Sequence, residues 1–512
     1  METKSQINTK RIAKNTLFLY VRMMLLMVIS LYTSRVVLEK LGVDDYGIYN
    51  VVGGIVTMLG FLSSSMSNAV QRYLSFEIGH NGSVKVNDIF NVAQIAHFII
   101  AIFVFVALEV GGLWYIDKYL NVPIVRIDAA IWVLQCSIIC TIFSIIQVPY
   151  TSVMIAREEM GIYAYISIVD AILKLLVAYI LMVTTFDKLK SYAVLMMVSQ
   201  MLILLIMRLY CKKKYSETRF KRVKDISLLK ELMGFAGWNA FGEIAWILTG
   251  QGVNMILNCF FGPVVNAARA VAEQVNGAVL RFVSNFQTAI NPQIVKSYAA
   301  NEWGETMKLV YRGTKMSYFL LFILSLPLIL EMERILNIWL VVVPKYTTVF
   351  CQLILINSIV MSISNLLAQI ARAYGKIRNY QLIVSFFLAL NFPLSYFLLK
   401  FGASPVSTVI VNICIQISLI FVRLLLIKKM ITFNFLDYIN NVFKPIFFAT
   451  VVAVIIPFLL KRYLYDTFIS SIIVIVASIL CSLCASYFIG MNKKEKLFVK
   501  GVFVKFLGKL KL

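Results

Sequence analysis

The sequence predicts an all-α, polytopic integral membrane protein. Of its 512 residues, 60% are hydrophobic and only 14% are charged. Apolar runs of about 20 residues, the length that a helix needs to cross a bilayer, recur from one end of the chain to the other. This pattern excludes a water-soluble enzyme, because a soluble domain carries a larger share of charged residues on its surface.

About fourteen transmembrane helices are expected, because that many apolar runs are separated by charged or turn-forming segments. The first run follows a basic, hydrophilic segment and has no small-residue cleavage site, so it is expected to remain in the mature chain. The expected spans are residues 13–38, 46–68, 92–114, 129–150, 162–185, 191–210, 235–259, 264–290, 313–332, 348–371, 379–400, 405–427, 443–460 and 467–490.

Basic residues are divided unequally between alternate connections. The N-terminus, the loops after even-numbered spans and the C-terminal tail together hold about three times as many Lys and Arg as the other loops. Positive charge is retained on the cytoplasmic side, so both termini are predicted to be cytoplasmic. This topology accounts for most of the net charge of +24, and no nucleic-acid partner is needed to explain it.

The tail and the thiol groups add two further expectations. Residues 491–512 mix lysines with Phe and Leu, which predicts a helix lying on anionic lipid. All cysteines except Cys211 fall inside expected spans and are expected to pack as small apolar groups, with only His80 and His97 available to complete a soft metal site. Neither a phosphate-binding loop nor a dinucleotide fingerprint is present, so no cofactor and no metal is expected.

The longest hydrophilic stretch in the interior predicts how the chain is organised. It reads as a cytoplasmic linker between two lobes of six spans each, and an even number of spans gives both lobes the same orientation. The predicted parts are an N-lobe at residues 1–210, the linker at 211–234, a C-lobe at 235–430, and two further spans with the basic tail at 431–512.

Three stretches carry a resemblance to a known family. They are "YTSRVVLEKLGVDDYGIYNVVGGIV", "QVPYTSVMIAREEMGIYAYISIVDAILKLL" and "GQGVNMILNCFFGPVVNAARAVAEQV". Over residues 10–430 the chain resembles the Wzx-type flippases of the multidrug/oligosaccharidyl-lipid/polysaccharide exporter superfamily, which act on O-antigen and capsule repeat units. The resemblance implies a two-lobed transporter in the bacterial inner membrane, with a cationic central cavity lined by spans 1, 2, 7 and 8. This cavity would open alternately to the two sides of the membrane. The resemblance further implies undecaprenyl-pyrophosphate-linked sugar as the substrate, and neighbouring polymerase and chain-length proteins.

Cations within the spans are the candidate substrate site. A charged side chain is costly inside a bilayer and therefore tends to face a cavity or an opposite charge. By their positions in the spans, Arg22 and Arg281 lie on the cytoplasmic side of the membrane centre, whereas Arg35 and Arg269 lie on the outer side. A guanidinium binds phosphate through two parallel hydrogen bonds, so these two tiers predict a route for a pyrophosphate. Lys174 in the fifth span is the remaining candidate cation.

Structural roles for several of these residues stay open. Arg269 and Glu273 are four residues apart on one helical face, so they either neutralise each other or line the cavity. Asp170 and Lys174 have the same spacing, and they form either an intrahelical pair or, alternatively, a lumen-facing site or a proton relay within the first lobe. Arg35 either binds substrate or extends to the outer head groups.

The other polar candidates in the spans are one acid and three amides. Glu243 has no cation at helical spacing in its own span, so it is a candidate proton or sodium coupling site, or else a static counter-ion for the arginines. Gln251, Asn254 and Asn266 either contact sugar hydroxyls or hold helices together.

Two other functions compete with flipping. A cation-coupled multidrug exporter of the same superfamily would be expected to have an acidic cavity, whereas basic residues outnumber acidic ones within the expected spans. A membrane glycosyltransferase or polymerase would need a large outer loop for its catalytic residues. The acidic turn at Asp44 and Asp45 is too short for that role and is interpreted as a solvated turn, so the sequence predicts a transporter and not an enzyme.

Overall fold

The computed structural model consists of helices joined by turns, with no strand in the parts of the chain that it describes. Residues 4–22 are described by their backbone alone. The described ranges are residues 4–79, 83–157, 159–219, 221, 227–230, 233–234, 247–299, 302–374, 378–431, 434–493 and 495–497.

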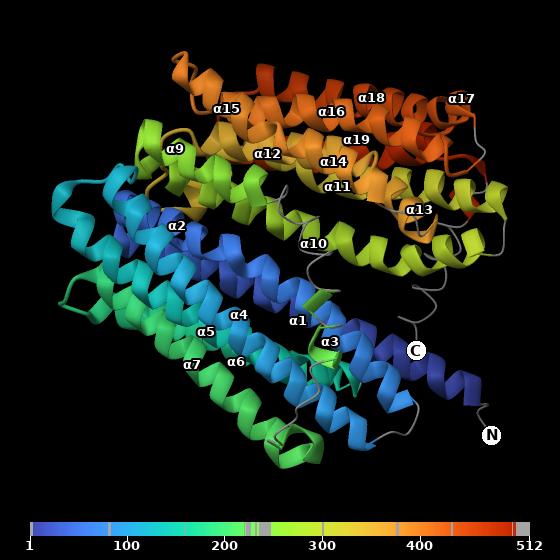
Figure 1. Ribbon diagram of the computed structural model, residues 1–512. Coiled ribbons are helices and arrows are strands. Elements are labelled where there is room, and N and C mark those ends of the chain that lie inside the picture. The colour runs from blue at the N-terminus through green and yellow to red at the C-terminus, as the bar shows by residue number, and fades with distance from the viewer. Residues whose placement is uncertain are drawn as a thin grey trace. The chain divides into compact units, whose positions relative to one another are not determined.

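Residues 1–267, together with 340–344, form one compact unit. At its centre α5 packs against α2, α3, α4 and α7, and α1 packs against α6 (Figure 1). A short 3₁₀ turn at Met58–Gly60 joins α2 to α3. The helices of this unit are α1 (Lys4–Leu41), α2 (Val43–Thr57), α3 (Phe61–Gly79), α4 (Ser83–Lys118), α5 (Ile127–Ala156), α6 (Met160–Val183), α7 (Lys188–Lys214) and α9 (Val253–Phe261).

Residues 268–339, together with 345–512, form the second compact unit. Here α11 packs against α12 and α19, α12 packs against α16, and α18 packs against α19. Its helices are α10 (Pro263–Ala299, which begins in the first unit), α11 (Trp303–Trp339), α12 (Thr347–Ser362), α13 (Leu367–Tyr374), α14 (Arg378–Ala389), α15 (Asn391–Lys400), α16 (Ser407–Lys428), α17 (Phe435–Tyr438), α18 (Lys444–Tyr463) and α19 (Phe468–Ala485).

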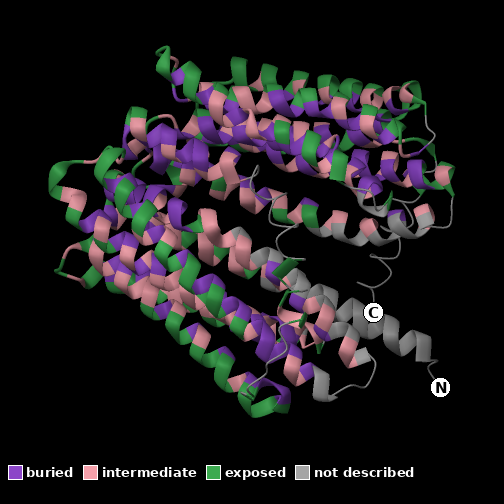
Figure 2. Cartoon of the chain, viewed as in Figure 1, coloured by how far each residue is buried: buried purple, intermediate pink, exposed green. Residues whose placement is uncertain are grey.

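The burial pattern is that of a protein surrounded by lipid. Among the described residues, eight helices are long and apolar enough to cross a membrane. Exposed and buried positions alternate along the helices (Figure 2). Large apolar side chains lie on the outside of these helices, as with Phe103 (59% exposed) and Phe447 (63% exposed), while small polar residues such as Ser478 are buried. Water would penalise this arrangement, but hydrocarbon does not. The prediction of an all-α, polytopic membrane protein is therefore confirmed.

Each of the fourteen expected spans overlaps a helix in the described residues, although the seventh is described only from residue 247. The tenth expected span is interrupted at residues 363–366, between α12 and α13. There the backbone bonds run from residue i to i+3, as from the N–H of Ser364 to the carbonyl of Met361 at 3.2 Å. Tighter turns of this kind continue the path of the chain while ending the regular α-helical ladder.

Two distant side chains support this interruption from within the second unit. Arg423 of α16 is only 4% exposed and donates to the hydroxyl of Ser364 at 3.1 Å. The hydroxyl of Tyr438 donates to the carbonyl of Ile363 at 2.5 Å. A buried carbonyl outside the helical ladder needs such a donor, because an unpaired polar group inside a membrane costs several kcal/mol.

The predicted linker begins as an ordered extension of the first unit. Its first residues complete α7, and the next ones lie against α4 and contact Arg157, which follows the end of α5. The side-chain amide of Asn87 donates to the carbonyl of Glu217 at 2.7 Å, and Arg157 Nε donates to the Glu217 carboxylate at 2.9 Å. Much of the later linker, including residues 222–226, lies outside the described residues. The division into lobes at residues 211–234 stays a prediction.

Buried polar contacts fix the last two long helices to α11. Glu331, only 3% exposed, accepts from Lys461 Nζ of α18 at 3.0 Å and from Ser471 Oγ of α19 at 2.6 Å. In the first half of α11, Lys315 Nζ lies 2.7 Å from Glu495 Oε2, and both side chains are almost fully buried. The beginning of the predicted lipid-bound tail is therefore attached to α11, while residues 498–512 of that tail lie outside the described residues.

At one end of the first unit, Arg126 joins three helix connections. Its guanidinium pairs with Asp45 at the start of α2, at 2.6 Å, and with Asp187, which caps the N-terminus of α7. Asp45 is only 5% exposed. The interpretation of Asp44 and Asp45 as a solvated turn is therefore wrong for Asp45, because a cation 81 residues away in the chain compensates for its burial.

The Asp187 carboxylate of this cluster predicts a loss of stability in acid. Partial burial acts to raise the pKa of Asp187, but the backbone N–H of Lys190, at 3.0 Å, and the Arg126 guanidinium outweigh it and hold the pKa below the usual 3.8. A carboxyl whose folded pKa lies below its unfolded pKa stabilises the fold above about pH 4, and this contribution is lost as the pH falls through the folded pKa. At pH values below about 4, the unfolding midpoint in detergent should therefore decrease less steeply with falling pH in Asp187→Asn than in the wild type.

The matched control for this experiment is Asp117→Asn. Asp117 is also close to the end of a long helix, but its side chain is 71% exposed. The acid-dependent drop should persist in this control. An Asp187→Asn variant whose midpoint falls as steeply as that of the wild type would contradict the proposed role of the carboxylate.

Candidate functional site

The predicted cavity residues are divided between the two compact units. The first unit holds Arg35, Asp170, Lys174 and the three amide candidates, and the second holds Arg269, Glu273 and Arg281. Glu243 and the side chain of Arg22 lie outside the described residues.

Helix α10 carries the charged candidates of the second unit along one stripe. Arg269, Glu273, Gly277 and Arg281 follow one another at four-residue intervals. At 1.5 Å and about 100° per residue, this stripe is roughly 18 Å long and turns about 40° at each step. Arg269 and Arg281 therefore point in directions roughly 120° apart and do not share one face of the helix.

The solvent exposure of the charged side chains increases along the stripe from Arg269 to Arg281. Arg269 is only 9% exposed, the Glu273 side chain is 51% exposed, and Arg281 is exposed. The reason lies in how α10 packs within its own unit. The carboxamide of Asn276 accepts a hydrogen bond from Ser358 of α12 at 2.7 Å, and Arg269 is on the same side of the helix as Asn276. Arg281 is turned away from that packed side.

Arg269 and Glu273 form a loose ion pair. Arg269 Nε lies 4.0 Å from Glu273 Oε1, which is the limit of an ion pair and too long for a hydrogen bond between these two atoms. This geometry places opposite charges together without a bidentate contact. The more exposed Glu273 can turn away from Arg269 at little cost, since a half-exposed pair is worth about 1 kcal/mol or less.

In the first unit, Asp170 and Lys174 of α6 contact each other directly. Lys174 Nζ lies 2.7 Å from Asp170 Oδ2, and the two side chains are 42% and 29% exposed, respectively. This is the intrahelical arrangement that the four-residue spacing predicts. Arg35, near the end of α1, is half-buried and follows directly before the buried residues Val36 and Val37.

The amide candidates lie where α2, α9 and α10 meet. Asn266 donates to Asn254 Oδ1 at 2.8 Å, and Asn266 Oδ1 accepts from Asn258 at 3.1 Å. Asn258 accepts in turn from the backbone N–H of Asn121 at 2.9 Å. These buried bonds hold helices together. The half-buried Gln251 also has its side chain against α2, where a methyl group on Gly54 would meet both Gln251 and Asn254.

Two glycines permit this close approach. A methyl group on Gly54 would lie 2.5 Å from Gln251 Oε1, and one on Gly47 would lie 2.0 Å from the carbonyl oxygen of Pro263. Gly262, which ends α9, has a φ of +75°, a conformation that other residues rarely adopt. Gly54, Gly262 and Pro263 are therefore positions of close packing or tight turning.

Sequence reasoning missed the buried ionic groups Lys315, Glu331 and Glu495. The signal for two of them was present, because Lys315 and Glu331 fall inside an expected span. Each has an opposite charge nearby, namely Glu495 for Lys315 and Lys461 for Glu331. The pair of Glu331 and Lys461 joins α11 to α18, and the pair of Lys315 and Glu495 joins α11 to the start of the tail, so neither forms part of the stripe on α10.

The described residues offer no metal site. No three His, Cys, Asp or Glu side chains gather there in a suitable arrangement. His97 is fully buried, and its Nδ1 lies 2.8 Å from the carbonyl of Ala93, while His80 lies outside the described residues. All eight cysteines are free thiols.

Comparisons with known proteins place this fold among membrane transporters. Residues 20–180 match the MatE family. No curated protein matches the sequence. A structure of the lipid II flippase MurJ in an inward closed conformation is similar to the chain with a TM-score of 0.70 and 13% identity, covering 92% of this chain and 98% of MurJ.

Two further structures are similar over a smaller share of the chain. An inward-facing multidrug resistance MATE transporter has a TM-score of 0.65 and 10% identity, covering 80% of this chain and 98% of its own. A transporter from Pyrococcus furiosus, described as having a binding pocket of reverse polarity, has a TM-score of 0.57 and 12% identity, covering 80% and 94%. The chain therefore shares its fold with these solved transporters, and its residues 20–180 match the MatE family model.

Proposed function

We propose that the protein flips undecaprenyl-pyrophosphate-linked oligosaccharide repeat units from the inner to the outer leaflet of the bacterial inner membrane, by alternating access. The observation that carries this proposal is the stripe on α10. It ends in Arg281, an exposed guanidinium in a helix that resembles a cavity-lining span of flippases. Such a group suits a pyrophosphate, which offers several oxygen acceptors to a planar fork of donors.

The charge balance of the described candidates supports an anionic substrate. Asp170 is paired with Lys174, and Glu273 with Arg269, so each candidate acid already has a base beside it. Within the described side chains, Arg35 and Arg281 form no ion pair. An organic cation would need an accessible acid that has no base beside it, and Glu243, which lies outside the described residues, stays the candidate for that role or for a coupling site.

The similar structures also favour a lipid-linked substrate. The match to a lipid flippase covers 92% of this chain, whereas the match to the multidrug transporter covers 80%. A reversed pocket polarity in one member of the superfamily fits a fold whose substrate class follows the charge of its pocket.

The energetics require no strict ion coupling. A membrane potential that is negative inside favours outward movement of an anion by roughly 2.3 kcal/mol per charge per 100 mV. The protein must chiefly supply a polar route, because sugar hydroxyls lose their hydrogen bonds in hydrocarbon.

The proposal also includes the topology and the partners. Both termini are cytoplasmic, the protein contacts membrane lipids, and polymerase and chain-length proteins are its partners.

The test measures flipping in proteoliposomes that contain the full-length protein and an undecaprenyl-pyrophosphate oligosaccharide. An impermeant glycosidase cleaves the sugar that becomes exposed on its side of the membrane. We expect Arg281→Gln to slow exposure about tenfold or more, because a charge-assisted hydrogen bond is worth roughly 1.5–3 kcal/mol. Arg462→Gln, an exposed arginine at the end of α18, is the matched control and should flip at the wild-type rate.

Two results would refute the flippase proposal, and a third would refute the role of the arginines. If wild-type vesicles expose no more sugar than protein-free vesicles, the protein is not a flippase for this lipid. If they instead release an organic cation against a proton gradient, the protein is a multidrug exporter. If the wild type flips the lipid but Arg281→Gln and Arg35→Gln flip it equally fast, these arginines do not bind the substrate.

A further inference from the structure

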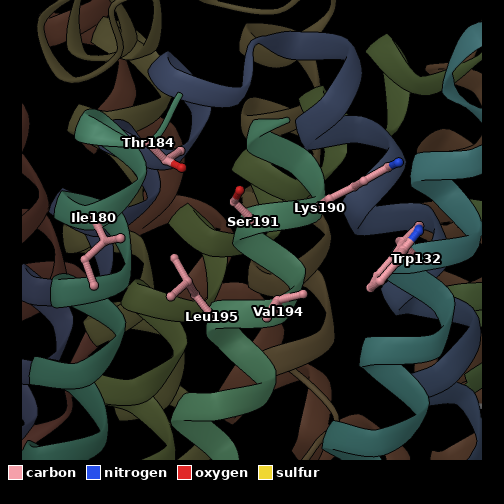
Figure 3. Close-up of a pocket in the computed structure, with 7 residues that line it drawn as sticks. All are labelled: Trp132, Ile180, Thr184, Lys190, Ser191, Val194 and Leu195. Carbon is pink, nitrogen blue, oxygen red and sulfur yellow. The ribbon is translucent and has the colours of Figure 1, made fainter. Parts of the chain in front are cut away.

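We propose that a hollow on the outside of the first unit binds one membrane phospholipid with a phosphoethanolamine head group. The hollow lies at the ends of α5, α6 and α7, beside the connection between α6 and α7, and has a volume of about 330 Å³ (Figure 3). It is separate from the candidate cavity residues described above. Its lining consists of Trp132, Ile180, Thr184, Lys190, Ser191, Val194 and Leu195.

Polar and apolar lining residues occupy different depths. Thr184, Lys190 and Ser191 lie at the ends of α6 and α7, while Ile180 and Leu195 lie one turn deeper, or about 6 Å along the helices (Figure 3). All three helices are among those long and apolar enough to cross a membrane. The hollow therefore changes from polar to apolar in the same direction as a phospholipid does, from its head group to its chains.

The exposed side chains of the hollow also fit a position at the membrane boundary. Trp132 is 48% exposed and Ile180 is 47% exposed, so both offer apolar surface to the membrane. The ammonium of Lys190 lies 6.0 Å from the centre of the Trp132 ring. An indole beside a lysine near a helix end is typical of the boundary between hydrocarbon and head groups. One acyl chain fits against Ile180, Val194 and Leu195.

The charged lining residue Lys190 and its ion-pair partner select the head group. Lys190 forms an ion pair with Asp128, whose side chain is 69% exposed. A lysine ammonium has three N–H donors, so one carboxylate contact leaves donors for a phosphate. The exposed carboxylate beside it repels a purely anionic head group but accepts from a primary ammonium. A neutral pair of this kind complements a phosphate and an ammonium carried on one zwitterionic head.

This pairing distinguishes three common kinds of head group. Phosphoethanolamine can bind both partners, with its phosphate at Lys190 and its ammonium at Asp128. Phosphocholine has no N–H with which to donate to Asp128, and phosphoglycerol has no cation. The expected order of affinity is therefore phosphatidylethanolamine first, with the other two weaker.

The experiment is native mass spectrometry of the full-length protein in detergent, titrated separately with the three lipids carrying identical acyl chains. We expect the wild type to retain one phosphatidylethanolamine molecule about tenfold more tightly than either other lipid, since a charge-assisted hydrogen bond is worth roughly a factor of ten. Asp128→Asn should abolish the preference for phosphatidylethanolamine. Lys190→Gln should weaken the binding of all three lipids.

A third variant tests the hollow without changing its charge. Val194→Trp should fill it and release the lipid, whereas Val198→Trp, one turn further along α7 and 39% exposed, should not. Lys212→Gln, an exposed lysine at the other end of α7, controls for loss of a positive charge. The inference is overturned if the wild type holds phosphatidylglycerol or phosphatidylcholine as tightly as phosphatidylethanolamine. It is equally overturned if Val194→Trp, with a wild-type unfolding midpoint, keeps the bound lipid.

Discussion

Glu495→Gln is expected to lower the free energy of unfolding by about 3–5 kcal/mol, the usual cost of removing one member of a buried ion pair. Glu495 Oε2 lies 2.7 Å from Lys315 Nζ, and the side chains of Lys315 and Glu495 are 4% and 6% exposed. The substitution keeps the shape of the side chain but leaves the ammonium of Lys315 buried without its counter-charge. Glu495 Oε2 also accepts from the backbone N–H of Asn492 at 2.8 Å, so the start of the tail should loosen as well.

The measurement is denaturant unfolding in detergent micelles, followed by tryptophan fluorescence, because Trp303 and Trp339 lie at the two ends of α11. Lys493→Gln changes an exposed charge two residues from Glu495 and should leave the midpoint unchanged. Replacing both partners with apolar residues, as in Lys315→Met with Glu495→Leu, should restore most of the stability. If the single and double variants are equally unstable, the pair contributes through its shape and not through its charge.

Gly47→Ala is expected to destabilise the first unit by about 1–3 kcal/mol, despite the better helix propensity of alanine. The added Cβ would lie 2.0 Å from the carbonyl oxygen and 2.9 Å from the Cβ of Pro263. A backbone carbonyl at the start of α10 cannot move aside in the way that a flexible side chain can. The start of α10 would have to shift, and the buried bonds between Asn254 and Asn266 would weaken with it.

Gly53→Ala is the matched control for this prediction. Gly53 is in the same helix, but a Cβ there meets nothing within 4 Å. The same chemical change should therefore stabilise α2 by up to about 1 kcal/mol, through helix propensity alone. Thermal unfolding in detergent measures both variants. Equal effects of the two substitutions would mean that the contact between α2 and α10 is loose enough to accept a methyl group.

Local spacing let the sequence predict some contacts of the candidate site. Asp170 and Lys174 pair as their four-residue separation predicts, and Arg269 lies near Glu273 for the same reason. A helix has a fixed rise and rotation, so residues four apart are neighbours whatever surrounds them. The difference in burial between Arg269 and Arg281 was not predictable in this way, because it depends on which side of α10 meets α12.

Long-range contacts could not be predicted from the sequence, for a physical reason. The partner of Lys315 is 180 residues away, and the partners of Arg126 are 81 and 61 residues away in opposite directions. No periodicity links such positions, since only the packing of helices brings them together. The same limit explains why Asp45 was interpreted as solvated.

The sequence by itself determined that the chain is an all-helical protein of the membrane. Hydrocarbon accepts only segments that satisfy their own backbone hydrogen bonds and present apolar side chains, so composition and run length are sufficient evidence. Only the tertiary structure decided which intramembrane polar groups serve packing. It assigned Asn254, Asn266 and Arg423 to contacts between helices and left Arg281 exposed, because burial and pairing depend on neighbours that the order of residues does not specify.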